Sequence, residues 1–437
     1  MFSRKNRRPR SPELVQAWEL LDAGDVLGAL RQLRTAPDGL PLGEVALVVG
    51  RAAQTAGFDD LRQAATALAA HPAQAQALYD FGYACVERGL SHLAVPALRE
   101  VLRHNPDALV VVRELVSAYE DEGRHREAVE LLTRHEGTLA DWPDRYLLAY
   151  NAVMAGDLTL AHRQHGLLSE PDDPQWLPAR DRQRRMLERA TAAAPASPLD
   201  AGDLRGWQYV IGGTVLGTLS PHGYDAGMTG RYAFLQDTPG QCLRGLLRLR
   251  VLLEAAEVRP RSVSLLPDRG SRILGLAAAE VLGLPAEPFA AGREDTVVVA
   301  YDLNDLAAEH PAVVDQLFGR ATGQVLHEHA SCWTDAPAVT ADSVTLLHQA
   351  VVAPWGEQLR QGADGGLERG PADDRPEAVI AEEIVRADPA PETGDDSAPA
   401  DPDETFAAFV TAVRGNWLRG DRAGLRSTGP VASSRFF

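Results

Sequence analysis

The sequence of 437 residues is 45% apolar and 24% charged, a balance typical of a soluble globular protein with room for two or three domains. Its formal charge of −18 disfavours non-specific binding to nucleic acid. No stretch reaches the roughly 20 apolar residues of a membrane-spanning helix. Three widely spaced cysteines without metal-ligand spacing fit a reducing compartment, so we expect a cytoplasmic protein without a membrane partner.

The chain begins with the basic stretch MFSRKNRRPR, which no apolar core of a signal peptide follows. We expect residues 1–9 to form a flexible arm. An alternative is that this arm docks on an anionic surface.

Five glycines recur between residues 10 and 195 at spacings of 33, 32, 34 and 33 residues: Gly24, Gly57, Gly89, Gly123 and Gly156. The fifth residue after the glycine is alanine in four cases (Ala29, Ala94, Ala128 and Ala161) and Arg62 in the second. Apolar residues three and four positions apart mark one face of a helix on either side of each glycine. The period predicts stacked helical pairs, with the glycine in the turn and the alanine where two helices touch.

The third and fourth repeats carry this pattern most completely, as Leu78, Phe81, Gly82, Cys85, Gly89, Ala94, Leu98, Val101 and Pro106, then Leu115, Tyr119, Gly123, Ala128 and Leu132. Over about two-fifths of the chain, the sequence resembles tetratricopeptide repeats. The resemblance implies an all-α solenoid over residues 10–195. In such repeats the first helix of each pair lines an extended concave surface that binds a protein or peptide.

The register of the repeats places seven residues on this surface: Trp18, Arg51, Tyr79, Tyr83, Arg113, Tyr146 and Tyr150. Tyr, Trp and Arg are the side chains that most often anchor interfaces, so these are the candidate partner-binding residues. The alternative is that the aromatic side chains pack between helical pairs. Beyond the fifth repeat, Arg180–Ala193 is expected to close the solenoid, and residues 194–203 to form a linker.

The periodicity changes in residues 204–361, which we expect to form an α/β domain. Trp207–Ile211 and Thr214–Leu219 are β-rich runs separated by Gly212-Gly213, which predicts a hairpin. Residues 222–236 are expected to form a loop, and Thr238-Pro239 begins a helix as N-cap and first-turn proline.

Three strand–helix units are predicted next. The strands are Ser262–Leu266, Thr296–Tyr301 and Gln324–His329, and the helices are Ser271–Leu282, Asp305–Phe318 and a segment near Ala341–Val351. Valine- and leucine-rich strands that alternate with helices predict a mostly parallel sheet covered on both faces, in a Rossmann-like three-layer arrangement.

The loop after the first of these strands contains Asp268, Arg269, Gly270 and Ser271, where a turn and a helix start could bind an anion. The alternative is that Asp268 or Ser271 only caps the helix. The surrounding run SVSLLPDRGSRILGLAAAEVLGLP resembles the strand–loop–helix opening of type I phosphoribosyltransferase domains over 24 residues. The next strand has one acid, Asp302, and no Thr-Gly phosphate loop, so the resemblance implies ligand or partner binding without catalysis.

Polar side chains also follow the other two strands. His327 and His329 share one face of the third strand, and Asp302 ends the second. Together they are candidates for acid–base catalysis or metal ligation. Buried, hydrogen-bonded histidines are the alternative, so we assign no metal and expect no cofactor.

Residues 362–403 contain many acidic and proline residues, and we expect a disordered linker there. Residues 404–420 then return to a helical pattern with Phe406, Phe409, Val410, Val413 and Trp417 on one face, which we expect to dock on the chain itself rather than on a partner. Residues 421–437 are expected to form a flexible tail.

Two functional hypotheses follow. The first is a non-catalytic adaptor that holds a protein or peptide on its helical repeats. The second is an enzyme or small-ligand binder that uses Asp268–Ser271, Asp302, His327 and His329. They differ in whether the loops after the three strands converge on one open pocket.

Overall fold

A computed structural model describes residues 8–36, 39–335, 339–362, 365–394, 396–425, 427 and 429–433. The chain divides into two compact units, Met1–Asp172 and Asp173–Phe437. Most of the expected basic arm and the last four residues of the expected tail lie outside the described residues. Among the helices of the described residues, none combines the length and apolar character needed to cross a membrane.

The described part of the first unit is helical. Its ten α-helices are α1 (Pro12–Asp22), α2 (Val26–Arg34), α3 (Leu42–Ala56), α4 (Asp59–Ala70), α5 (Ala75–Glu87), α6 (Ser91–His104), α7 (Leu109–Asp121), α8 (His125–Arg134), α9 (Tyr146–Ala155) and α10 (Leu158–His165). Short helical turns at Glu136–Thr138 and Asp141–Arg145 join α8 to α9.

Each of the five periodic glycines lies between the two helices of a pair, as the period predicts. All five have a positive φ, between 65° and 86°: Gly24, Gly57, Gly89, Gly123 and Gly156. Residues with a side chain rarely adopt this conformation, so glycine ends the first helix and turns the chain. The four alanines of the repeat are fully buried, which agrees with close helix contact: Ala29, Ala94, Ala128 and Ala161.

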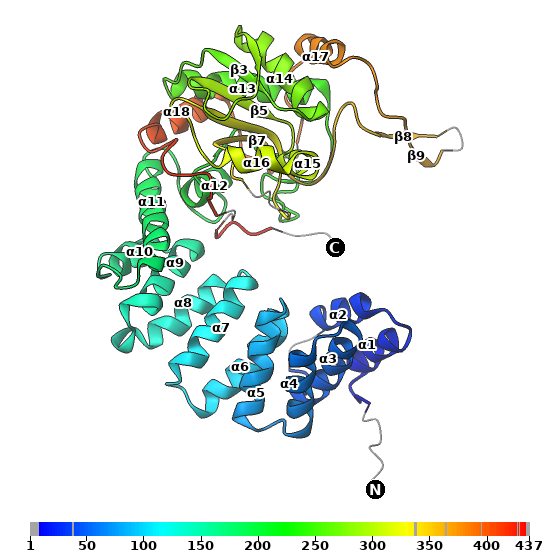
Figure 1. Cartoon of the computed structure of the whole chain (residues 1–437), viewed down its shortest axis with the longest axis vertical. Helices are drawn as coiled ribbons and strands as arrows, with labels where there is room; N and C mark the ends of the chain where they lie inside the picture. Colours follow the sequence, from blue (N-terminus) through cyan, green and yellow to red (C-terminus); the bar gives the residue numbers. More distant parts are fainter. Residues whose placement is uncertain are drawn as a thin grey trace. The chain divides into compact units, whose positions relative to one another are not determined.

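Helices of the first unit pack on their neighbours in the chain, as Figure 1 shows for α1 to α10. The first helices of successive pairs also meet, since α1 contacts α3 and α5 contacts α7. One apolar cluster runs from Leu14 to Leu148 through these contacts. No single pair could bury its apolar face alone, so the core exists only because the pairs stack.

The second unit contains a mostly parallel sheet and its covering helices. The helices are α11 (Leu177–Ala193), α12 (Leu204–Gly212), α13 (Pro239–Ala255), α14 (Arg269–Leu282), α15 (Leu303–Glu309), α16 (Pro311–Leu317), α17 (Glu377–Arg386) and α18 (Asp403–Val413). The strands are β1 (Val215–Leu216), β2 (Tyr232–Gln236), β3 (Ser262–Leu265), β4 (Ala286–Pro288), β5 (Thr296–Ala300), β6 (Val325–Cys332), β7 (Ser343–Val352), β8 (Leu359–Gln361) and β9 (Leu367–Arg369).

Within the described residues, the large sheet has the order β1-β7-β6-β5-β3-β4, and β2 also pairs with β7. All its pairings are parallel. β1 and β2 pair with successive parts of β7, so residues 217–231 leave the sheet edge between them. α13 packs on β6 and β7, and α14 packs on β3 and β5. β8 and β9 form a separate antiparallel hairpin that projects from the unit (Figure 1).

The three predicted strands are confirmed as β3, β5 and β6. The helices predicted after the first two are also confirmed, as α14 and as the pair α15 and α16. The start of α13 is also confirmed, because the Thr238 side chain accepts a hydrogen bond from the Gln241 N–H and Pro239 is the first helical residue.

Three secondary-structure predictions in this unit are wrong. Residues 232–236 lie in the expected loop but form β2 and pair with β7. Residues 207–211 belong to α12, because the Asp203 side chain caps the Gly206 N–H and Gly213 ends the helix in the left-handed region. Residues 343–352 form β7, not a helix, because this β-branched segment lies between β6 and the edge strands and completes the sheet.

The expected closing helix of the solenoid also belongs elsewhere. α11 lies in the second unit and packs on α12 and α18. Its buried residues include Met186, Leu187 and Ala190, which form an apolar stripe that needs these helices for cover.

The expectation of a disordered segment at residues 362–403 is wrong as well. This segment contains β9 and α17, and α17 packs on α13 and α14 with Ile380 and Ile384 buried. The helix expected at residues 404–420 is α18, and its apolar face packs on α13 and α11 of its own unit. The second residue of the expected flexible tail is buried, since Arg422 donates to the Asp342 carboxylate at 2.8 Å.

Candidate functional sites

Four of the seven predicted partner-binding residues are engaged within the first unit. Trp18 and Tyr146 are buried, with 8% and 5% of their surface exposed. The Arg51 guanidinium lies 4.7 Å from the Trp18 ring centre and pairs with Asp22. Arg113 donates to both carboxylate oxygens of Asp144, at 2.6 and 3.0 Å. These contacts join neighbouring helices. At these positions the side chains therefore pack between helical pairs, which is the alternative to partner binding.

On α5, Tyr83 is exposed at the surface and Tyr79 is partly buried against the core. Their rings stack with centroids 6.3 Å apart, and Tyr83 is 44% exposed. Partial burial, followed by the nearby Glu114 carboxylate, raises the pKa of Tyr79. Burial and the neighbouring Glu87 likewise raise the pKa of Glu114. We call Tyr79, Tyr83, Glu87 and Glu114 together the tyrosine face. Within the described part of the chain, no arginine forms an ion pair with Glu114.

Tyr150, the last of the seven predicted partner-binding residues, lies on α9. Its ring stacks on Tyr146 with centroids 6.2 Å apart, and it meets the His125 ring edge-on at 6.3 Å. Nearby, Asn151 donates to Glu120 at 2.5 Å, and burial raises the pKa of Glu120 to about 7. The polar groups in this region satisfy one another and tie α7, α8 and α9 together.

The candidate catalytic residues of the second unit have different partners. His327 lies 2.9 Å from the Ser343 hydroxyl, whereas His329 lies 3.0 Å from the Asp237 carboxylate. Asp302 caps α15 by accepting from the Asn304 N–H at 2.8 Å. All three are buried, and burial lowers the pKa of His327 to about 3. All three have partners inside the unit, so the geometry resembles the alternative of buried, hydrogen-bonded histidines.

The buried Asp237 carboxylate, just before α13, is the hydrogen-bond acceptor for several buried side chains. One of its carboxylate oxygens accepts from the Tyr301 hydroxyl at 2.9 Å and lies 3.3 Å from the Cys242 thiol. Ligand atoms of Asp237, Cys242 and His329 lie within 4.8 Å of one another. Burial raises the pKa of Cys242 well above its ordinary value, which favours the neutral thiol over the thiolate that a metal requires. The cluster is therefore explained as a hydrogen-bonded core network.

The predicted anion loop is also occupied by its own contacts. Asp268 accepts from the Ser271 N–H at 2.9 Å and is the N-cap of α14. The Ser271 hydroxyl accepts from the Tyr301 N–H at 3.0 Å. Arg269 donates to the backbone carbonyls of Asp373 and Arg375 at 2.8 and 2.9 Å. This arrangement matches helix capping, and Gly270 lies against Tyr301 and Trp355.

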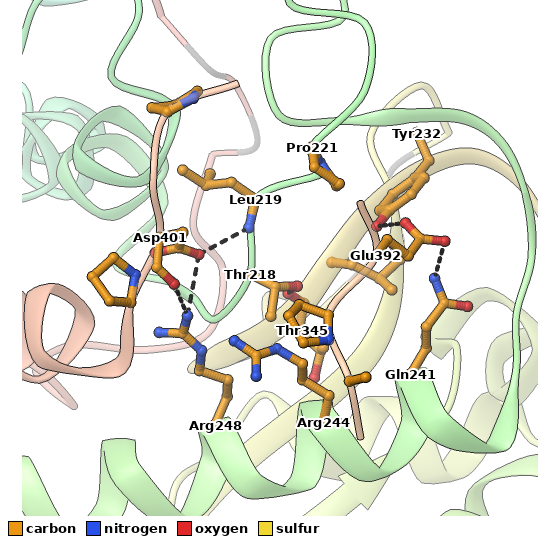
Figure 2. Close-up of a pocket in the computed structure, with 15 residues that line it drawn as sticks. Thr218, Leu219, Pro221, Tyr232, Gln241, Arg244, Arg248, Thr345, Glu392 and Asp401 are labelled. Carbon is orange, nitrogen blue, oxygen red and sulfur yellow. Dashed lines mark hydrogen bonds and ion pairs between the residues drawn. The ribbon is translucent and has the colours of Figure 1, made fainter. Parts of the chain in front are cut away.

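A pocket of about 330 Å³ lies elsewhere in the second unit, between α13, the segment after β1 and the start of β7. Figure 2 shows Arg244 and Arg248 rising from α13, with Thr345 beside Arg244 and with Thr218 and Leu219 on the segment after β1. The segment from Ala390 to Pro402 lies across it; we call this segment the acidic strap, of which residue 395 lies outside the described residues.

Two strap carboxylates hold the rim of this pocket (Figure 2). Glu392 accepts from the Tyr232 hydroxyl and from the Gln241 amide, both at 2.8 Å. Asp401 pairs with Arg205 at 2.9 Å and with Arg248 at 3.4 Å. The pocket is therefore closed by contacts between residues more than 150 positions apart.

Sequence reasoning missed this pocket entirely. Arg244 and Arg248 are four positions apart on α13, a spacing that places them on one helix face and could have indicated a basic patch. Nothing local connects them to the acidic strap, which the composition assigned to a linker.

Comparisons with known proteins add little to this geometry. No protein-family model matches the chain, and no curated protein matches it. One similar solved structure is that of MamA MSR-1 C2. It is 22% identical over 41% of this chain and 96% of its own, with a TM-score of 0.23.

Proposed function

We propose that the first unit is a tetratricopeptide-like scaffold that binds a positively charged segment of another protein on its tyrosine face. The carrying observation is the stacked pair of the exposed Tyr83 and the partly buried Tyr79 beside the carboxylates of Glu87 and Glu114. The recurring glycine turn and buried alanine of each helical pair support the assignment to this repeat type.

The chemistry of the face selects the partner. Arginine and lysine side chains stack on tyrosine rings, and each such contact stabilises by about 0.5–1 kcal/mol at an exposed site. Carboxylates without a paired arginine add attraction for a cation and repel an acidic segment. Burial and Glu87 raise the pKa of Glu114, so a cation beside it would relieve an unfavourable carboxylate pair.

The proposal does not extend to catalysis by the second unit. His327, His329 and Asp302 are buried and hydrogen-bonded to separate partners, and Asp268 caps α14. None of these groups lines the pocket under the acidic strap.

The test uses the full chain and immobilised synthetic peptides of equal length whose sequences differ in net charge. We expect arginine- and lysine-rich peptides to bind and acidic ones not to bind. Substituting Tyr79→Ala together with Tyr83→Ala should weaken the best peptide at least about ten-fold, measured by fluorescence anisotropy. Leu27→Ala is the matched control, because Leu27 is 73% exposed on α2 and lies outside the tyrosine face.

A second variant separates charge from packing. Glu114→Gln keeps the shape of the side chain and removes its charge, so it should weaken basic peptides while the helical circular-dichroism signal is unchanged. Equal binding of basic and acidic peptides, or full binding by the double tyrosine variant, would show that this face is not the binding surface.

A further inference from the structure

We propose that the pocket under the acidic strap binds a small organic anion, a carboxylate or a phosphate ester with an apolar body, through Arg244. This site lies in the second unit and is independent of peptide binding by the tyrosine face. Its lining combines Arg244 with the hydroxyls of Thr218 and Thr345, and its apolar wall includes Leu219, Leu346, Pro391, Pro399 and Pro402.

Two aspartates, Asp401 and Asp403, form the ion pairs of the three arginines at this site, Arg205, Arg244 and Arg248. The remaining carboxylate of the lining, Glu392, instead accepts hydrogen bonds from Tyr232 and Gln241. Asp401 is already engaged, since it pairs with Arg205 at 2.9 Å and accepts from the Leu219 N–H at 3.4 Å. Arginine in a partly buried site is stabilised by an anion, because its charge persists at all ordinary pH values.

Arg244 is the guanidinium that lacks a close anion. Its only ion pair among the described residues is with Asp403 at 3.9 Å, and its side chain is 27% exposed. Arg248 beside it is 2% exposed, and its Nη1 atom is buried without a hydrogen-bond partner in the described part of the chain. A buried, unpaired donor on a charged group is costly, so an anion at this position would satisfy both arginines.

The size of the pocket sets the size of the ligand. Its volume of about 330 Å³ matches the lower end of small-molecule sites, which begin at roughly 300 Å³. A free inorganic ion would leave most of the proline and leucine wall uncovered. A ring or short chain that carries one anionic group would cover this wall and pair with Arg244.

The strap carboxylates form the rim of the pocket through contacts with groups other than Arg244. Glu392 is held by Tyr232 and Gln241 at one rim and Asp401 by the arginines at the other (Figure 2). Both are part of the folded chain, so they shape the entrance and leave the space beside Arg244 for the ligand. An acidic entrance also disfavours large polyanions such as nucleic acid.

The experiment is isothermal titration calorimetry of the full chain at low ionic strength with two probes, phenyl phosphate and benzoate. We expect at least one to bind to wild type, and the tighter of the two identifies the preferred anionic group. Arg244→Ala and Arg244→Gln should each weaken binding at least about ten-fold, which corresponds to 1.4 kcal/mol. Melting temperatures establish that both variants are folded.

Arg250→Ala is the matched control, because Arg250 is an exposed arginine on the same helix outside this pocket. It should bind the probe like wild type. Failure of both probes to bind would overturn the proposal. A loss below ten-fold in the Arg244 variants, or an equal loss in Arg250→Ala, would also overturn it, because binding would then reflect general attraction to positive charge.

Discussion

Arg205 and Asp401 lie 196 positions apart in the sequence and form a two-point ion pair, at 2.9 and 3.0 Å. Arg205 also donates to the backbone carbonyls of Leu216 and Gly217, at 2.8 and 3.1 Å. One guanidinium thus joins the sheet edge at β1 to the acidic strap. A segment with the composition of a disordered linker is ordered because its carboxylates neutralise buried arginines.

Replacing Asp401 with alanine should therefore destabilise the second unit. The change leaves Arg205 and Arg248 without their shared carboxylate, and the side chains of these arginines are only 8% and 2% exposed. Loss of one partner of a buried ion pair costs about 3 kcal/mol or more. Urea unfolding of the full chain measures this loss as a shift of the transition that belongs to the second unit. Asp396→Ala, an exposed strap carboxylate, is the control, and an equal effect of both changes would contradict the assigned role of Asp401.

Gly89→Ala should destabilise the first unit through the backbone alone. Gly89 has φ of 69°, and a Cβ there would meet nothing within 4 Å. The left-handed conformation costs a residue with a side chain about 1–2 kcal/mol, so this is the expected loss in free energy of unfolding. Gly137→Ala is the matched control, because a Cβ there also meets nothing and its φ is not in the left-handed region. Thermal unfolding followed by circular dichroism compares the two, and equal stabilities would disprove the explanation.

Gly245→Ala should destabilise the second unit by crowding. A Cβ at Gly245 would lie 2.7 Å from the Thr345 side chain and 2.8 Å from Nδ1 of His329. Overpacking of a core costs about 1–3 kcal/mol, and better helix propensity offsets up to about 1 kcal/mol of it. Denaturant unfolding should give a net loss, whereas Gly292→Ala, with nothing within 4 Å, should be neutral. A more stable Gly245→Ala protein would mean that α13 can move away from the sheet.

Stability of the second unit should fall in acid because of His327. Its ring bonds to Ser343 and Thr345 at 2.9 and 3.2 Å, and burial, followed by the neighbouring His329, lowers its pKa from 6.5 to about 3. The unfolded chain takes up this proton below pH 6.5, but the folded chain does not until about pH 3. The stabilisation is therefore complete above pH 6.5 and is lost as the pH falls through this window.

Denaturant unfolding at several pH values measures how the free energy of unfolding depends on pH. His327→Gln should lower stability at neutral pH and flatten the dependence between pH 6.5 and 3. Between pH 6.5 and 3 the wild-type protein should lose up to about 5 kcal/mol more stability than the variant, from 1.36 kcal/mol per pKa unit. Parallel curves for wild type and variant would assign the acid sensitivity to other groups.

Structural features that depend only on residues close together in the sequence could be predicted well. The left-handed glycines, the Thr238 cap of α13 and the strands β3, β5 and β6 each depend on neighbouring residues. Features that depend on distant partners could not. β7 is a strand because it pairs with β1, β2 and β6 in the sheet. The helix at residues 207–211 is a different case, because its capping residues Asp203 and Gly213 are local and the β-rich composition masked them.

The candidate sites divide in the same way. The repeat period alone indicated that Tyr79 and Tyr83 share the first helix of the third pair, and the helical register brings their rings together. Only the tertiary structure decided that Trp18 and Tyr146 are buried, that His327 and Asp302 have different partners, and that an arginine-lined pocket exists. The physical reason is that local backbone preferences are encoded within a few residues, whereas burial and ion pairing depend on which distant segments meet.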